Sequence, residues 1–313
     1  MSYKILIPKD INPSGKDYLL ARGYEIKLLT DSSPENICAN IADCDAILGR
    51  LGQYPRSIFE AGKKLKILAK HGVGVDDVDL DAAREHGVMV TNTPEANANS
   101  VAEHTICMML TCAQNLVQQD RRTRGGEFQS VRMEPTMEVA GMTMGLIGFG
   151  AIGRAVAKKA ALGLDMKVLV YNHRIMTDLP EYVQQVSFET LLGSSDVVSL
   201  HCPCNEETRD MIDEKALAMM KPTAILLNFA RGGIVDEEAL YKALAEHRIF
   251  MAGLDCFRQE PTTSAEPLFG LENTIVLPHS GGMSGIATDN MSMHAAMCID
   301  DFFSGREPRW IIK

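Results

Sequence analysis

The stretch TMGLIGFGAIGRAVAKKAALG, residues 143–163, decides the fold of this 313-residue chain. TMGLI is a short apolar run typical of a buried strand, and RAVAKKAALG has the composition of a helix. Between them stands GFGAIG, with glycines at positions 148, 150 and 153. A strand that turns into a helix through such glycines is typical of a parallel α/β sheet that binds a dinucleotide. A glycine-rich turn with no special purpose is the alternative interpretation.

Each part of this turn has a defined use in nucleotide binding. Gly148 permits the tight turn, Gly150 lets the backbone approach a pyrophosphate, and Gly153 lets the helix pack against the strand. Ala151 and Ile152 begin the helix, whose free N–H groups and dipole favour an anion. We therefore predict that this loop binds the phosphates of a cofactor.

The next strand, KVLVYN, bears on the choice between the two nicotinamide dinucleotides. NAD-binding proteins place an acidic residue near its end, where it binds the ribose 2′-hydroxyl. Here Asn172 stands nineteen residues after Gly153 and is followed by His173 and Arg174. No carboxylate at these positions repels a 2′-phosphate, and Arg174 can form two parallel hydrogen bonds with one. The pattern indicates NAD(P)(H) and favours NADP(H). Alternatively, Arg174 is a solvated loop residue and Asn172 binds the ribose diol.

Strand-like and helix-like segments alternate along the whole chain. Short apolar runs include KILIP and LKILAK before the glycine turn, and VVSLHCP, AILLNFA, IFMAGLD and TIVLP after it. This alternation predicts parallel sheets with helices on both faces. It breaks at TPEANANS, residues 93–100, and long helices are expected over 101–122 and 285–303.

The chain is longer than a single core usually supports, so two domains are expected. We predict an α/β fold of two Rossmann-like domains. The dinucleotide-binding domain would span residues 100–282, and a discontinuous substrate domain of flavodoxin-like type would combine residues 1–99 with 283–313.

Composition restricts the partners of this protein. The net charge of −10 argues against nucleic acid or an anionic membrane surface. No apolar run approaches the roughly 18 residues of a membrane span, and the first residues show no signal-peptide pattern, so a cytoplasmic protein is expected. The closest of the eight cysteines, Cys202 and Cys204, have no second close pair that would complete a zinc site. Reduced thiols and no metal site are therefore expected.

Three residues in the last third of the chain suit the chemistry of a 2-oxo acid. Arg231 in LLNFARGGIVDEEAL can hold a carboxylate at two points and polarise a ketone. His279 in IVLPHSGG can supply a proton near neutral pH. Glu260 in AGLDCFRQEP can raise the pKa of an adjacent imidazole and fix its tautomer. Singly, the three could be a loop arginine, a surface charge before Pro261 and a core histidine.

Further strings, HGVGVDDVD, TPEANANSVAEH and SLHCPCNEETRDMI, occur with these in a characteristic order. With them the chain resembles the D-isomer-specific 2-hydroxyacid dehydrogenase family over essentially its whole length. The resemblance implies a catalytic cleft between two domains, an NAD(P)-dependent 2-hydroxyacid dehydrogenase activity, and the catalytic roles given above to Arg231, Glu260 and His279. It also implies a homodimer formed through the cofactor domain.

The resemblance extends to other positions. The amides of Val73 and Gly74 would receive the substrate carboxylate, together with Arg231. Asp255 and Thr105 would lie near the cofactor; alternatively, they cap a strand and pack a helix. Arg50 would contact a larger or phosphorylated acid, or is an ordinary exposed arginine.

The sequence after the histidine bears on the substrate. Ser280, Gly281 and Gly282 follow His279, where D-lactate-specific members of the family carry an aromatic residue. This departure favours acids of the glyoxylate/hydroxypyruvate or 3-phosphoglycerate type. The alternative function is a dinucleotide-sensing, corepressor-like binding protein on the same scaffold.

Overall fold

The computed structural model describes residues 2–312, and the chain divides into two compact units. Unit 1 comprises Met1–Asn97 and Gly282–Lys313, and unit 2 comprises Ala98–Gly281. The division drawn from the sequence, at 99/100 and 282/283, lies two residues and one residue from these bounds.

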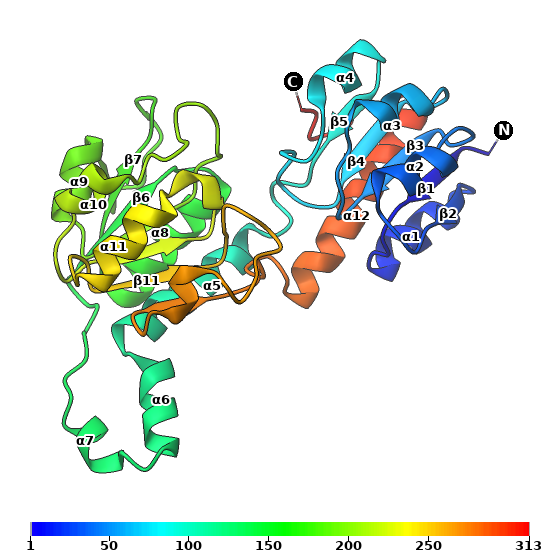
Figure 1. The fold of residues 1–313 in the computed structure, drawn as a ribbon. Helices are drawn as coiled ribbons and strands as arrows, with labels where there is room; N and C mark the ends of the chain where they lie inside the picture. The colour runs from blue at the N-terminus through cyan, green and yellow to red at the C-terminus, as the bar shows by residue number, and fades with distance from the viewer. Residues whose placement is uncertain (1, 313) are drawn as a thin grey trace. The chain divides into compact units, whose positions relative to one another are not determined.

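Unit 1 is built on a parallel sheet of five strands in the order β2-β1-β3-β4-β5. This is the flavodoxin-like order of a doubly wound sheet. Its strands are β1 (Lys4–Ile7), β2 (Glu25–Leu28), β3 (Ala46–Gly49), β4 (Ile67–Lys70) and β5 (Met89–Thr91). Its helices are α1 (Pro13–Leu20), α2 (Pro34–Asn40), α3 (Arg56–Ala61), α4 (Leu80–Glu85) and α12 (Gly285–Phe303). The last helix, α12, packs against α1 and β4, and Figure 1 shows it beside the strands of this unit.

Unit 2 is built on a parallel sheet of seven strands in the order β12-β11-β10-β9-β6-β7-β8. Counted within the unit and read from the other edge, this is the Rossmann order 3-2-1-4-5-6 with a seventh strand added. Its strands are β6 (Thr143–Ile147), β7 (Lys167–Tyr171), β8 (Val183–Gln185), β9 (Val197–Leu200), β10 (Ile225–Asn228), β11 (Met251–Leu254) and β12 (Thr274–Val276). The prediction of an α/β fold with parallel, Rossmann-like sheets is confirmed.

Helices cover both faces of this second sheet, which explains its nearly continuous apolar strands. The α-helices of unit 2 are α5 (Ala98–Ala113), α6 (Leu116–Arg124), α7 (Phe128–Arg132), α8 (Ala151–Leu164), α9 (Phe188–Ser194), α10 (Glu214–Met219) and α11 (Glu237–Ala245), with 3-10 turns η1 (Gly232–Ile234) and η2 (Pro267–Gly270). One buried cluster joins α5 and α8 to the sheet, and another joins α9, α10 and α11 to it.

The expected helix over 101–122 is wrong in one respect, because the structure breaks it in two. Helix α5 ends at Ala113, and α6 begins at Leu116. Between them Asn115 adopts a left-handed conformation with φ of 51°. Asparagine is one of the few residues that tolerate this conformation, so it permits the chain to change direction here. Figure 1 shows α6 and α7 lying apart from the sheet of unit 2.

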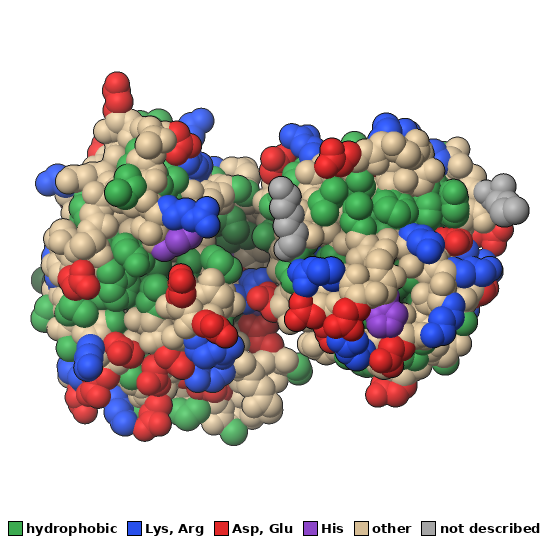
Figure 2. Space-filling model, turned by 90° about the horizontal axis from the view of Figure 1, so that it is seen from above, with side chains coloured by type: hydrophobic (Ala, Val, Ile, Leu, Met, Phe, Trp, Pro, Cys, Tyr) green, Lys and Arg blue, Asp and Glu red, His purple; other side chains and the backbone are tan. Residues whose placement is uncertain are grey.

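The surface of the molecule carries mixed charge. Figure 2 shows acidic and basic side chains interspersed over the face in view. Within residues 2–312 no helix has both the length and the apolar character that crossing a membrane requires.

Candidate active site

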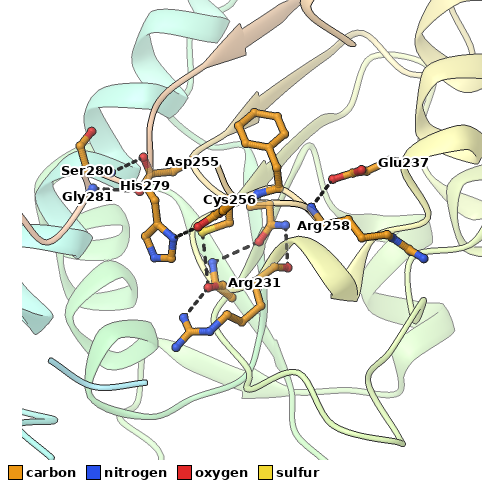
Figure 3. A network of polar contacts seen from close by, with 12 residues as sticks. Arg231, Glu237, Asp255, Cys256, Arg258, His279, Ser280 and Gly281 are labelled. Atoms are coloured by element: carbon orange, nitrogen blue, oxygen red, sulfur yellow. Dashed lines mark hydrogen bonds and ion pairs between the residues drawn. The ribbon is translucent and has the colours of Figure 1, made fainter. Parts of the chain in front are cut away.

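The predicted catalytic residues follow three neighbouring strands of unit 2. Arg231 stands just after β10, Glu260 lies in the loop after β11, and His279 stands just after β12. Strand β11 pairs in parallel with both β10 and β12, so the carboxyl ends of all three lie at one edge of the sheet. Ligands of open α/β sheets bind at this edge. Figure 3 shows Arg231 and His279 brought close together there.

The imidazole of His279 and the carboxylate of Glu260 form a direct pair. His279 Nδ1 lies 2.7 Å from Glu260 Oε2, and the two side chains are 44% and 37% exposed. The other carboxylate oxygen, Oε1, accepts a hydrogen bond of 2.9 Å from the amide of Phe257. Glu260 is therefore fixed by the backbone and in turn orients the imidazole through Nδ1.

This pairing changes the protonation of both groups. The Cys256 sulfur and the Glu260 carboxylate raise the pKa of His279 from its ordinary 6.5 to about 10. Partial burial of Glu260 opposes ionisation, but hydrogen bonds from His279 and the Phe257 amide outweigh it and lower the pKa of the carboxyl group. Burial raises the pKa of the Cys256 thiol, so this neighbour is a neutral thiol at neutral pH. Glu260 is thus the charged partner of the imidazolium.

The loop that carries Arg231 is shaped by a buried amide side chain. Asn228 at the end of β10 donates to the carbonyl of Arg231 at 2.9 Å and accepts from the amide of Ala230 at 3.1 Å. The guanidinium of Arg231 donates from Nη1 to the Ala230 carbonyl at 2.7 Å. The sequence analysis missed this role of Asn228, although an amide residue at the end of an apolar strand was a visible signal.

Asp255 holds the loop that follows His279. Its buried carboxylate accepts hydrogen bonds from the amides of Ser280 at 2.7 Å and Gly281 at 2.8 Å. His279 itself has φ of 53°, so its backbone needs such support. The contact supports the strand-end role that was the alternative for Asp255, and its place near the cofactor stays a prediction.

Cys256 is a second residue that the sequence analysis missed. It is buried, and its Sγ lies 3.4 Å from the Ala230 carbonyl that also binds Arg231. Its sulfur and donor atoms of Glu260 and His279 all lie within 4.8 Å of one another. Nothing in the sequence distinguished it from the other seven cysteines, because the contact depends on three separate loops.

The glycine turn has the geometry that a pyrophosphate cradle needs. Gly148 has φ of 94°, and a Cβ on it would lie 2.6 Å from the carbonyl oxygen of His201. A Cβ on Gly153 would lie 2.5 Å from the carbonyl oxygen of Gly148. Gly150 precedes α8, whose N-terminus, beginning with Ala151 and Ile152, has no side-chain cap. The residues present therefore fit a dinucleotide, whose phosphates the helix N-terminus can bind.

The loop after β7 contains the three residues predicted to choose between cofactors. Gln185 of β8 donates to the carbonyls of Asn172 at 3.3 Å and Arg174 at 2.8 Å. His173 and Arg174 are exposed. Gln185 is a further residue that sequence reasoning missed, because β8 has no apolar alternation that would predict a strand. Gln185 thus supports the loop backbone, to which the Asn172 side chain also donates at the Arg174 carbonyl, 3.5 Å away.

Thr105 lies in the interior of α5. Its hydroxyl donates to the Val101 carbonyl at 2.8 Å, and the residue is fully buried. This geometry supports helix packing, the alternative reading of Thr105, and its predicted place near the cofactor remains untested.

Three predicted substrate residues belong to unit 1. Arg50 follows β3 and donates from Nη1 to the Asp10 carbonyl at 3.0 Å. Val73 and Gly74 lie in the loop after β4, where the Val73 carbonyl accepts from Asn92 at 2.7 Å. Within residues 2–312, no backbone-to-backbone hydrogen bond uses the amide of Val73 or Gly74. Their roles toward a substrate stay predictions.

The Rossmann strand order, the glycine cradle and the histidine–carboxylate pair at the sheet edge are typical of a dinucleotide-dependent oxidoreductase. Comparison with known proteins makes the class specific. Residues 106–281 match the model of the D-isomer specific 2-hydroxyacid dehydrogenase, NAD binding domain. The chain belongs to the D-isomer-specific 2-hydroxyacid dehydrogenase family, and it is an NAD(P)-dependent oxidoreductase that acts on the CH–OH group of 2-hydroxy acids.

Individual relatives cover most of the chain. A glyoxylate reductase of Korarchaeum cryptofilum is 37% identical and covers 98% of this chain and 95% of its own. A hydroxypyruvate reductase of Thermotoga maritima is 42% identical over 74% of this chain and 75% of its own. The solved structure of an NADPH-dependent glyoxylate/hydroxypyruvate reductase from Sinorhizobium meliloti, in complex with NADP and malonate, is similar with a TM-score of 0.89. It is 27% identical and covers 100% of this chain and 97% of its own.

Proposed function

We propose that this protein works mainly as a reductase of small 2-oxo acids, either glyoxylate and hydroxypyruvate or the 2-oxo acid that corresponds to 3-phosphoglycerate. The observation that carries the proposal is the 2.7 Å hydrogen bond between His279 and Glu260 at the same sheet edge as Arg231. The names of the two relatives, a glyoxylate reductase and a hydroxypyruvate reductase, support this substrate class.

Arg231 has the chemistry to bind and polarise the substrate. Its planar guanidinium can hold the carboxylate and the neighbouring ketone oxygen. The cation favours the negative charge that develops on the ketone oxygen, and such electrostatic stabilisation is often the largest catalytic contribution. The cofactor, when bound, supplies the hydride to the carbonyl carbon.

His279 has the position of the proton donor. Glu260 occupies Nδ1, so the proton on Nε2 is the one that can pass to the developing alkoxide. The product is then the 2-hydroxy acid, and the imidazole regains its proton from solvent before the next turnover. In the oxidation direction the same nitrogen accepts the proton.

A substrate panel tests this proposal against the alternative of a corepressor-like sensor. Purified protein is mixed with NADPH or NADH and a series of 2-oxo acids, and the absorbance of the reduced nicotinamide is followed. We expect oxidation with glyoxylate or hydroxypyruvate. If neither cofactor is oxidised with any acid while both still bind, the sensor is the better description.

We also propose that the cofactor is NADP(H). Arg174 is exposed beside Asn172, and no acidic residue occupies positions 172–174. A charge-assisted hydrogen bond contributes about 1.5–3 kcal/mol, so Arg174→Ala is expected to weaken NADPH binding by roughly 10- to 100-fold. NADH is the internal control, because it lacks the 2′-phosphate. An equal loss for both cofactors, measured by fluorescence titration, would remove Arg174 from the choice.

We further propose a homodimer that uses the segment Leu116–Arg132, which contains α6 and α7. Large apolar side chains are exposed on this segment and just after it: Leu116, Val117, Phe128 and Met133. Several exposed apolar side chains on one segment support a surface that another protein covers, and a symmetric second copy is the usual partner. Light scattering is expected to give twice the 34.3 kDa of one chain, and Phe128→Asp with Met133→Asp is expected to halve that value.

A further inference from the structure

Cys256, Glu260 and His279 bring three metal-binding side chains to one point. Their donor atoms, a sulfur, a carboxylate oxygen and an imidazole nitrogen, lie within 4.8 Å of one another. The side chains of Glu260 and His279 are 37% and 44% exposed, whereas Cys256 is buried. An ion can therefore reach the cluster from solvent through Glu260 and His279.

The thiol, imidazole and carboxylate donors favour zinc-like divalent cations. Thiolate and imidazole favour zinc and similar borderline-soft cations, whereas magnesium and calcium prefer oxygen donors alone. We propose that Cys256, Glu260 and His279 form an inhibitory site for a divalent cation of the zinc class. The inhibition rests on the reductase function proposed above, but the binding does not.

The geometry needs little adjustment to hold such an ion. Zinc bonds of about 2.0–2.3 Å at tetrahedral angles place donor atoms about 3.3–3.8 Å apart. The His279 Nδ1–Glu260 Oε2 separation is 2.7 Å, so this pair would open by about 0.6 Å to reach that range. The Cys256 Sγ lies within 4.8 Å of both other donor atoms, and on binding the ion the thiol would give up its hydrogen bond of 3.4 Å to the Ala230 carbonyl. Three protein ligands leave a fourth position for water. Structural zinc sites, by contrast, usually have four protein ligands.

Occupancy of this site has a direct consequence for the reaction. A cation bound to His279, Glu260 and Cys256 displaces the proton that the imidazole and the carboxylate share, and it also displaces the thiol proton. Both protons are released to solvent. Glu260 then no longer orients a protonated imidazole, so proton transfer to the alkoxide stops. The glycine turn at Gly148 lies after β6, on another strand, so cofactor binding is expected to persist.

Metal binding can be measured apart from activity. We expect equilibrium dialysis of the purified full chain against Zn²⁺ to give one ion per chain. Co²⁺ in its place is expected to show the charge-transfer absorption of a thiolate ligand. Cys256→Ser and Cys256→Val are expected to weaken Zn²⁺ binding by more than about 100-fold, because loss of an outer-shell partner alone costs about 10- to 100-fold.

Controls separate this site from the other thiols. Cys204→Ser, near Cys202 in the same unit, is expected to leave Zn²⁺ binding unchanged, as is Cys107→Ser at an exposed thiol. Each variant is first required to match the thermal midpoint of the parent protein, so that misfolding is not read as ligand loss.

Two outcomes overturn the proposal. One is a parent protein that binds no Zn²⁺, or binds it without the thiolate absorption of the Co²⁺ form. The other is undiminished Zn²⁺ binding in both Cys256 variants. A protein that binds Zn²⁺ through Cys256 yet turns over no 2-oxo acid would leave the site standing and contradict the reductase function instead.

Discussion

Glu260 and His279 are 19 residues apart and meet only because β11 and β12 are neighbours in the sheet. Sequence strings singled out both residues and suggested that a carboxylate would lie beside the imidazole. The hydrogen bond from the Phe257 amide, which fixes Glu260, could not be predicted, because it depends on the course of one loop. For the same reason Cys256 was not recognised as a neighbour of His279.

Arg231 allows a prediction at the scale of one side chain. Arg231→Lys keeps the charge but removes the planar fork that grips carboxylate and ketone together. We expect kcat/KM for the best 2-oxo acid to fall by about 10²- to 10³-fold, the usual cost of losing one donor to a developing oxyanion. Steady-state kinetics measure this.

Arg258→Lys is the matched control for that substitution. Arg258, in the loop after β11, pairs with Asp210 and donates to the Val235 carbonyl at 3.0 Å, so its side chain contacts the loops after β9 and β10. Its replacement is expected to leave kcat/KM within a few-fold of the parent value. Equal losses in the two variants would argue against a specific role for the Arg231 guanidinium.

The loops after β10 and β11 pack closely, because their backbones are in direct contact. A Cβ on Gly232 would lie 1.8 Å from the carbonyl carbon of Phe257. No side chain fits there, so Gly232→Ala is expected to force apart the loops that carry Arg231 and Glu260. Displacement of catalytic groups by about 1 Å can cost about 10²-fold, and we expect turnover to fall by at least that factor.

The neighbouring glycine provides the comparison. A Cβ on Gly233 would meet only side-chain atoms, at 3.0 Å from Cys204 Sγ and 3.7 Å from Arg209 Nη1. Gly233→Ala is therefore expected to retain most of the turnover, and both variants should bind cofactor as before. If Gly232→Ala proves as active as Gly233→Ala, the close approach is not what positions Arg231.

Elements of secondary structure were predictable to different degrees. Helix α12 (Gly285–Phe303) has the bounds that the sequence suggested, because turn residues and Ser284 precede it and Gly305 follows it. The turn at Asn115 was not predicted. An apolar segment followed by a polar one gives the same sequence pattern whether it forms one long helix or two consecutive helices. Strand β8 was missed because VQQ lacks both alternation and bulk.

At the scale of the whole chain, the first and last segments share unit 1. Asp300 on α12 joins them, because its carboxylate accepts hydrogen bonds from Tyr18 at 3.2 Å and Tyr24 at 3.0 Å. Arg306 donates to it as well, at 2.8 Å. Burial opposes its ionisation, but these partners outweigh burial and lower the pKa of Asp300. No pattern in the sequence indicated this network, which links residues about 280 positions apart.

The lowered pKa makes the contribution of Asp300 dependent on pH. Its folded-state pKa lies below the unfolded value of about 3.9, so the stabilisation is complete above that pH and is lost as the pH falls through the folded value. Asp300→Asn is therefore expected to lower the thermal midpoint at pH 7 and to lower it less at roughly pH 2. Calorimetry at both pH values measures this.

Asp301→Asn is the control for this effect. Asp301 is the next residue on the helix and pairs with Arg306 at 2.7 Å on a more exposed side chain. Exposed pairs contribute little, so its replacement is expected to shift the midpoint much less than Asp300→Asn at pH 7. A midpoint difference for Asp300→Asn that is the same at both pH values would mean that its charge is not what joins the chain ends.

The most direct test of the catalytic role proposed for the His279–Glu260 pair is the rate of 2-oxo acid reduction by His279→Gln. Glutamine can still form hydrogen bonds but cannot deliver a proton as imidazolium does. We predict that kcat falls by about 10²- to 10⁴-fold, the range of general acid–base catalysis, while NADPH binds as tightly as before. Turnover equal to that of the parent protein, at unchanged cofactor affinity, would contradict the account.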